Sequence, residues 1–151
     1  MNSTLRSWIA GADESDFPIQ NLPLGIFSIH QDRKVCTRIG NQIVDLSLLH
    51  ANKLLDGLDI SIDVLNSEVL NSLIAIGKNK TRALRQRLVE LLELNTSSNK
   101  DHIASCMHPI DKVKLHIPFR IGDYTDFYSS KEHATNVGIM FRDPANALLP
   151  N

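Results

Sequence analysis

Residues 26–46 read IFSIHQDRKVCTRIGNQIVDL, and this stretch decides the fold. It contains three short runs rich in apolar and β-branched residues, at 26–30, 35–40 and 42–46, and each run predicts a strand. A polar turn separates the first two runs, and a tight hairpin loop at Asn41 and Gln42 leads into the last one. Because such short connections join antiparallel neighbours, the stretch predicts a small, curled antiparallel sheet.

A further strand is predicted at residues 112–118, where apolar and polar residues alternate strictly. Side chains of a strand point alternately to its two faces, so Val113, Leu115 and Ile117 lie on one face and the lysines and the histidine on the other. Pro118 lacks a backbone N–H and therefore ends the strand or marks it as an edge strand.

Helices are predicted between these strands. Asp45 or Ser47 can cap a short helix, and Asn66 or Ser67 can open a second helix that ends at Gly77.

The clearest helix follows Thr81, a good N-cap residue. Its basic residues come early and its acidic residues late, against the helix dipole, so packing must stabilise it. The leucines of one face fall at helical spacing and predict a buried stripe, although a partner-binding face is the alternative: Leu84, Leu88, Leu91 and Leu92.

Composition narrows the class of protein. A chain of 151 residues has the length of about one domain, and its net charge of −1 offers no field for nucleic acid or an anionic membrane. No apolar run is long enough to cross a bilayer, and the N-terminus lacks the apolar region of a secretory signal. Cys36 and Cys106 predict buried free thiols in a reducing compartment, and hence a cytoplasmic protein.

The chemistry-bearing stretch is 121–143, which reads IGDYTDFYSSKEHATNVGIMFRD and holds both tyrosines. Ser129 or Ser130 can cap a short helix, with a capping box that runs to Glu132, His133 in the first turn and the end at Gly138.

Three side chains of this stretch have catalytic or binding potential. Asp126 can ligate a hard cation, His133 can act as a general base, and Arg142 can pair with a substrate carboxylate. The structural alternatives are a turn-forming aspartate, a structural histidine and a surface ion pair between Arg142 and Asp143. One carboxylate is too few for a calcium or magnesium site, so other ligands must come from elsewhere.

The motifs at 121–130 and 133–143 resemble the signature of the fumarylacetoacetase family. The earlier stretch 15–27 is similar to the family's opening motif, and 43–46 also fits. The resemblance implies a hydrolase that cleaves a carbon–carbon bond of a β-diketo acid, 4-fumarylacetoacetate, to fumarate and acetoacetate in tyrosine and phenylalanine breakdown.

The same resemblance implies an α+β, mainly β fold. Residues 1–118 would be an N-terminal domain, a small SH3-like antiparallel barrel with two or three helices. Residues 119–151 would be an extended segment that begins a C-terminal, β-rich catalytic domain. Family members are homodimers, mainly through that C-terminal domain.

For the site, the resemblance implies a Ca²⁺ or Mg²⁺ cofactor with Asp126 as one ligand. It also implies that His133 activates the attacking water and that Tyr128 and Arg142 bind the substrate. The other metal ligands and the glutamate that orients the histidine would belong to the catalytic domain. The chain alone is therefore expected to show negligible turnover. A truncated, non-catalytic interaction module is the alternative, and a nucleic-acid-binding barrel is disfavoured by the net charge of −1.

Overall fold

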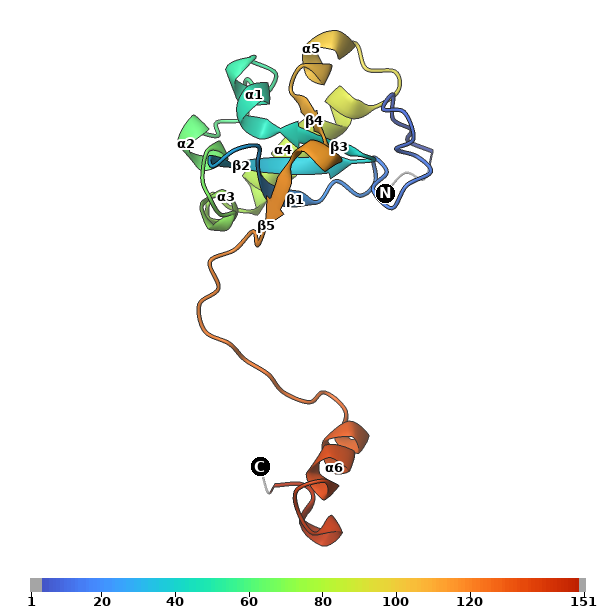
Figure 1. Ribbon diagram of the computed structural model, residues 1–151, viewed down its shortest axis with the longest axis vertical. Coiled ribbons are helices and arrows are strands. Elements are labelled where there is room, and N and C mark those ends of the chain that lie inside the picture. Colours follow the sequence, from blue (N-terminus) through green and yellow to red (C-terminus); the bar gives the residue numbers. More distant parts are fainter. Residues whose placement is uncertain (1–3, 150–151) are drawn as a thin grey trace. The chain divides into compact units, whose positions relative to one another are not determined.

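The computed structural model describes residues 4–149 and divides into two compact units, which meet in the sequence between Arg120 and Ile121 (Figure 1). Residues 1–3 of the predicted N-terminal domain and 150–151 of the predicted catalytic segment lie outside the described residues. The first unit is a small α+β domain. The second is short and contains one α-helix within its described residues.

The first unit is built on one antiparallel sheet of five strands in the order β4-β3-β2-β1-β5. The three strands predicted within 26–46 are confirmed, with ends shifted by up to two residues. Among residues 4–149 the sheet is open, with β4 and β5 at its two edges, so the closed barrel is not confirmed. The strands are β1 Leu24–Ser28, β2 Arg33–Ile39, β3 Gln42–Asp45, β4 Met107–Pro109 and β5 Lys114–His116.

The strand predicted at 112–118 is too long, since β5 covers only Lys114–His116. Its register on β1 explains both ends: Ser28 pairs with Lys114 and Ile26 with His116. Continued on the far side, this register would bring Pro118 opposite Leu24, where Pro118 has no N–H to donate to the ladder. On the near side, Ile110–Lys112 form a 3-10 turn, η1.

The helices of the first unit are α1 Leu46–Ala51, α2 Ile62–Leu65, α3 Asn71–Ala75, α4 Lys78–Leu92 and α5 Lys100–Ala104. The predicted cap of α1 is confirmed at Asp45, whose Oδ1 accepts hydrogen bonds from the Ser47 N–H (2.8 Å) and the Leu48 N–H (3.1 Å).

The helix predicted to open at Asn66 or Ser67 is shorter than expected. It starts at Asn71, and Asn66 instead ends α2. The reason is a long-range contact: the Leu70 N–H donates to the carbonyl oxygen of Pro118 at 2.7 Å, so it makes no bond within a helix. Tertiary structure here overrides local propensity.

The prediction that Thr81 is the N-cap of the leucine-rich helix is wrong. Gly77, with φ of +95°, lets the chain turn directly from α3 into α4, which therefore begins at Lys78. The Thr81 hydroxyl lies inside the first turn and donates to the carbonyl oxygen of Lys78 at 3.1 Å.

The core lies between α4, which passes behind the sheet in Figure 1, and one face of the sheet. All four leucines of the predicted stripe are buried there, which confirms the core prediction. Each contributes roughly 1.5–3 kcal/mol by removal from water. The predicted free, buried state of Cys36 and Cys106 is also confirmed. None of the helices in residues 4–149 is long and apolar enough to cross a membrane.

Gly40 closes the β2–β3 turn with φ of +52°, and a Cβ there would lie 3.1 Å from the Cα of Ala12. Gly57 also has a positive φ, +86°, but open space around it. We expect Gly40→Ala to lower the free energy of unfolding by about 2–3 kcal/mol and Gly57→Ala by about 1 kcal/mol. Urea denaturation of both variants checks this, and equal losses would show that the contact with Ala12 costs nothing.

Candidate active site

The second unit is organised by α6, Lys131–Ile139, and its N-cap Ser130. The Ser130 hydroxyl oxygen accepts a hydrogen bond from the His133 N–H (3.2 Å) and donates to Glu132 Oε2 (3.0 Å). The predicted serine cap and the place of His133 in the first turn are therefore confirmed. The reciprocal capping box is not formed, because Glu132 is the second helical residue and bonds the serine hydroxyl.

The structure brings together two of the four predicted site residues, Tyr128 and His133. Their rings meet edge to face, with centroids 5.0 Å apart and planes at 71°. Both side chains are exposed, and neither ring nitrogen of His133 has a hydrogen-bond partner within residues 4–149. The contact restricts the orientation of the imidazole and leaves its nitrogens free to take a proton.

Asp126 and Arg142 are not joined to that pair. Asp126 is exposed in the extended residues before α6 and makes no hydrogen bond or ion pair within residues 4–149. The Arg142 Nη1 donates to the Ala147 carbonyl oxygen at 3.2 Å. Asp143 accepts from the Ala145 N–H at 2.9 Å and caps the 3-10 turn η2, Pro144–Asn146. Within residues 4–149, the Arg142–Asp143 ion pair of the structural alternative does not form.

Gly138 has a role that the sequence prediction missed. The helix continues past it to Ile139, so Gly138 is not the end of the helix. It is buried, and a Cβ there would overlap the carbonyl oxygen of Ala147. The missing side chain thus lets η2 pack directly on α6. The available signal was a glycine inside a helical pattern.

A metal ion does not fit these residues alone. No group of three or more His, Cys, Asp or Glu side chains able to hold an ion occurs in residues 4–149. Calcium and magnesium take six or more oxygen ligands, counting water. Asp126 can therefore be one ligand, and this chain's described residues do not complete a site.

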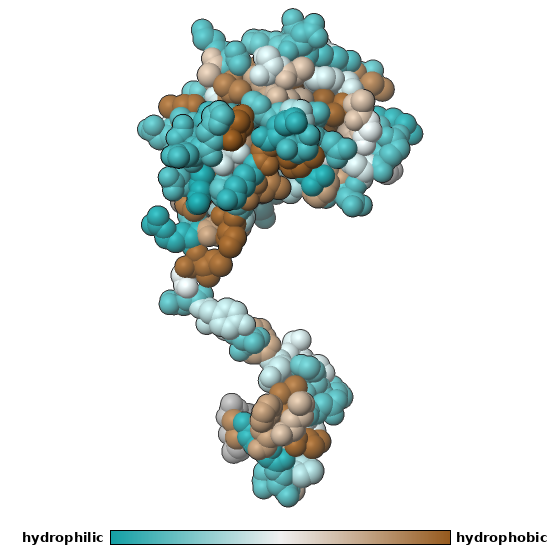
Figure 2. All heavy atoms as spheres, in the orientation of Figure 1, coloured by the Kyte–Doolittle hydropathy of each residue, from teal (hydrophilic) through white to brown (hydrophobic). Residues whose placement is uncertain are grey.

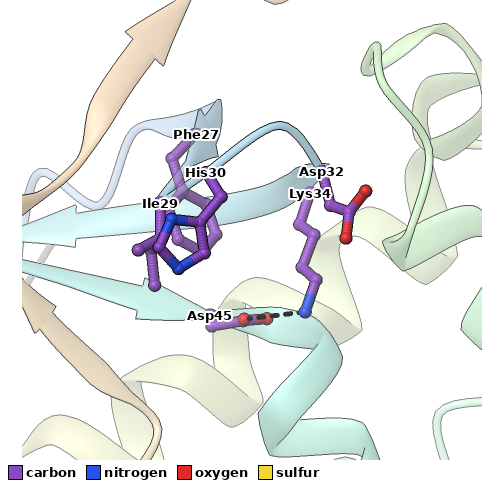
Figure 3. A pocket seen from close by; sticks show the side chains of 6 residues that line it. All are labelled: Phe27, Ile29, His30, Asp32, Lys34 and Asp45. Atoms are coloured by element: carbon purple, nitrogen blue, oxygen red, sulfur yellow. Dashed lines mark ion pairs between the residues drawn. The ribbon is translucent and has the colours of Figure 1, made fainter.

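The first unit carries several surface depressions, and one of about 180 Å³ lies on its sheet (Figure 3). There Lys34 Nζ lies 3.7 Å from Asp45 Oδ2, while Oδ1 caps α1. The depression is smaller than the roughly 300 Å³ at which small-molecule pockets begin. It is lined by Phe27, Ile29, His30, Asp32, Lys34 and Asp45.

The thiol of Cys36 does not add a nucleophile to the first unit. Burial first, and the Asp45 carboxylate second, raise the pKa of Cys36 to about 12, although a backbone hydrogen bond at Gly25 opposes them. At neutral pH this thiol stays protonated and inert. The segment around His133 is the better candidate active site.

The pKa of the Glu132 carboxyl lies below its usual range because its own backbone N–H and then the Ser130 hydroxyl stabilise the charged form. We expect Ser130→Ala to raise the pKa of Glu132 and to destabilise α6 locally by about 0.5–2 kcal/mol. Nuclear magnetic resonance (NMR) titration of Glu132 and the Cα shifts of α6 measure both effects. Ser129→Ala is the control because Ser129 takes no part in the capping bonds, and equal effects of the two variants would disprove the role of Ser130.

Fold and site together define a small α+β domain joined to a short helical segment that carries the candidate site. Residues 20–118 match the family described as "Fumarylacetoacetase N-terminal". The chain belongs to this fumarylacetoacetase family.

Relatives named fumarylacetoacetase match almost the whole chain, including the segment after residue 118. The Dictyostelium discoideum protein is 45% identical over an alignment 154 residues long, which covers 99% of this chain. The human protein is 43% identical and the Arabidopsis thaliana protein 37% identical, over 96% and 97% of this chain. In each case this chain spans only 36% of the relative's length.

Proposed function

We propose that this chain is the N-terminal part of a fumarylacetoacetase, with a first set of active-site residues that the rest of a full-length enzyme completes. The observation that carries the proposal is the 45% identity to the Dictyostelium protein over 99% of this chain. That match runs through the segment in which Tyr128 and His133 are in contact.

The reaction would be hydrolysis of 4-fumarylacetoacetate to fumarate and acetoacetate, a step of tyrosine and phenylalanine breakdown. His133 takes a proton from water through a free ring nitrogen, and the hydroxide formed adds to a carbonyl carbon of the diketone. The carbon–carbon bond then breaks, and the carbon that leaves with the electron pair receives the proton that His133 took from water. Tyr128 orients the imidazole and contacts the substrate.

Arg142 would bind a carboxylate of the substrate. Its guanidinium has five N–H donors, and the bond to the Ala147 carbonyl oxygen uses one of them. The remaining donors allow a second, charge-assisted contact while η2 stays packed on α6.

The proposal includes a Ca²⁺ or Mg²⁺ ion only if the rest of a full-length enzyme supplies further ligands. Asp126 is the residue here that we assign to it, and no step of the reaction is routed through the ion. The family resemblance also supports closure of the sheet into an SH3-like barrel, a homodimer and a cytoplasmic location, and the free buried thiols agree with a reducing compartment.

A non-catalytic interaction module is the second candidate. It is favoured by the scarcity of metal ligands in residues 4–149 and by the exposed aromatic side chains Tyr124, Phe127 and Phe141. Such a module would bind a partner through these rings and would not need His133 in a defined orientation.

Calorimetric titration with Ca²⁺ and Mg²⁺ separates the two candidates. The comparison uses this chain alone and a chimera, here called the Dictyostelium chimera, in which it replaces the matching segment of the Dictyostelium relative. We expect stoichiometric binding by the chimera, weakened at least tenfold by Asp126→Asn, and none by the chain alone. Unchanged binding by the Asp126→Asn chimera would remove Asp126 from the site.

A further inference from the structure

The two faces of the sheet are covered very differently. Helices cover one face, which carries Ile26, Val35 and Val44. The side chains next to these in sequence, Phe27, Cys36 and Ile43, point to the opposite face and form a second, smaller cluster. Within residues 4–149, the partly buried apolar residues that pack against that cluster are Ile110, in the 3-10 turn η1, and Val113, and none comes from an α-helix.

Strand β5 extends this second face with apolar side chains that remain exposed. Leu115 lies directly opposite Phe27 in the register, so both point to the same face. Val113 packs on the cluster, whereas Leu115 is 50% exposed and Ile117 is 73% exposed. The alternation at 113–117 is typical of a strand with one buried face, yet in this unit most of that face is uncovered.

The patch continues onto the end of β1. Ile29 is 48% exposed and lines the depression beside Phe27, where Asp32 and Lys34 form a polar border. We call Ile29, Leu115 and Ile117, with this depression, the β5 face. Protein–protein interfaces commonly have an apolar core surrounded by a polar rim, and the β5 face has this composition. Figure 2 shows hydrophobic residues gathered at the lower edge of the first unit, where the chain leaves it after β5.

We propose that the β5 face is a docking surface for the part of a full-length fumarylacetoacetase that lies outside this chain's span. That part amounts to about two thirds of each relative, since this chain spans 36% of them. The polypeptide leaves the first unit at Arg120, shortly after Ile117, so a covalently linked domain reaches this face at high effective concentration. The inference concerns packing and does not depend on the proposed activity.

The experiment compares thermal unfolding of glutamate variants in two contexts, this chain alone and the Dictyostelium chimera. Leu115→Glu and Ile29→Glu place a charge on the β5 face. Leu94→Glu is the matched control, since Leu94 is a leucine of similar exposure, 46%, outside this face. We expect both β5-face variants to lower the midpoint Tm by at least about 5 °C more in the chimera than in the chain alone. The control should shift Tm equally in both contexts.

Equal shifts of the β5-face variants in the two contexts would overturn the proposal. It would also be overturned if the chain alone were a dimer in sedimentation analysis that Leu115→Glu converts to a monomer, because a second copy would then be the occupant. If a variant chimera does not fold, hydrogen exchange of the unsubstituted chimera decides. Slower exchange of the β5 amides, Lys114–His116, than in the chain alone supports docking, and unchanged exchange refutes it.

Discussion

Replacing His133 by alanine in the Dictyostelium chimera should lower kcat/KM for fumarylacetoacetate hydrolysis by about 10²–10⁴-fold. The physical reason is the loss of the group that takes the proton from water, held at the start of α6 by the Ser130 cap and by the ring of Tyr128. Steady-state kinetics at saturating and limiting substrate measure the loss in kcat separately from any change in KM.

His102→Ala is the control for this prediction. His102 is also exposed, and its ring bonds the Asn52 side chain in the first unit, far in sequence from the candidate site. It should leave kcat/KM within a factor of about two, as expected for a surface substitution. A His133→Ala chimera with unchanged Tm and unchanged kcat/KM would remove His133 from the mechanism.

The largest stability effect is expected in α4. Leu88→Ala should lower the free energy of unfolding by about 2–5 kcal/mol, because it deletes a fully buried side chain of the main core and leaves a cavity. Urea denaturation of this chain, followed by circular dichroism, measures the change.

Leu94→Ala makes the same chemical change at a half-exposed position after the end of α4 and should cost less than about 1 kcal/mol. The charged side chains of α4 are arranged against the helix dipole, with no acidic residue in the first turn and no basic residue in the last. Core packing must therefore stabilise this helix. Equal losses for the two variants would contradict the assignment of the leucine stripe to the core.

Local patterns predicted much of the first unit. The hairpin strands were predicted to within two residues at their ends, the α1 cap was one of the two predicted residues, and the leucine stripe was predicted as it stands. The errors have two causes, one local and one distant. Thr81 is a good cap in isolation, but the nearby turn at Gly77 starts α4 earlier. The N–H of Leu70 donates to the carbonyl oxygen of Pro118, far along the chain, and therefore makes no bond within a helix.

The candidate site was predictable only in part for the same reason. The cap at Ser130 and the position of His133 follow from local sequence, and the structure adds the ring contact with Tyr128. No local rule brings Asp126 or Arg142 to that pair, and the described residues do not join them. The roles of these four residues rest on the family resemblance and stay predictions.

The exposed β5 face is a further feature that local sequence patterns explain only in part. The alternation at 112–118 predicted that Val113, Leu115 and Ile117 share one face, and Leu115 does lie opposite Phe27 in the register. Within the described residues of the first unit, Leu115 and Ile117 remain exposed, which is why we propose a cover from residues beyond this unit.

Hydrolysis of fumarylacetoacetate by this chain and by the Dictyostelium chimera, each checked for cooperative unfolding, tests the central claim most directly. The claim is that the chain holds one part of an active site that a full-length fumarylacetoacetase completes. It predicts turnover by the chimera at a rate near that of the Dictyostelium enzyme and negligible turnover by the chain alone. A folded chimera without activity, or a purified chain with robust turnover, would contradict it.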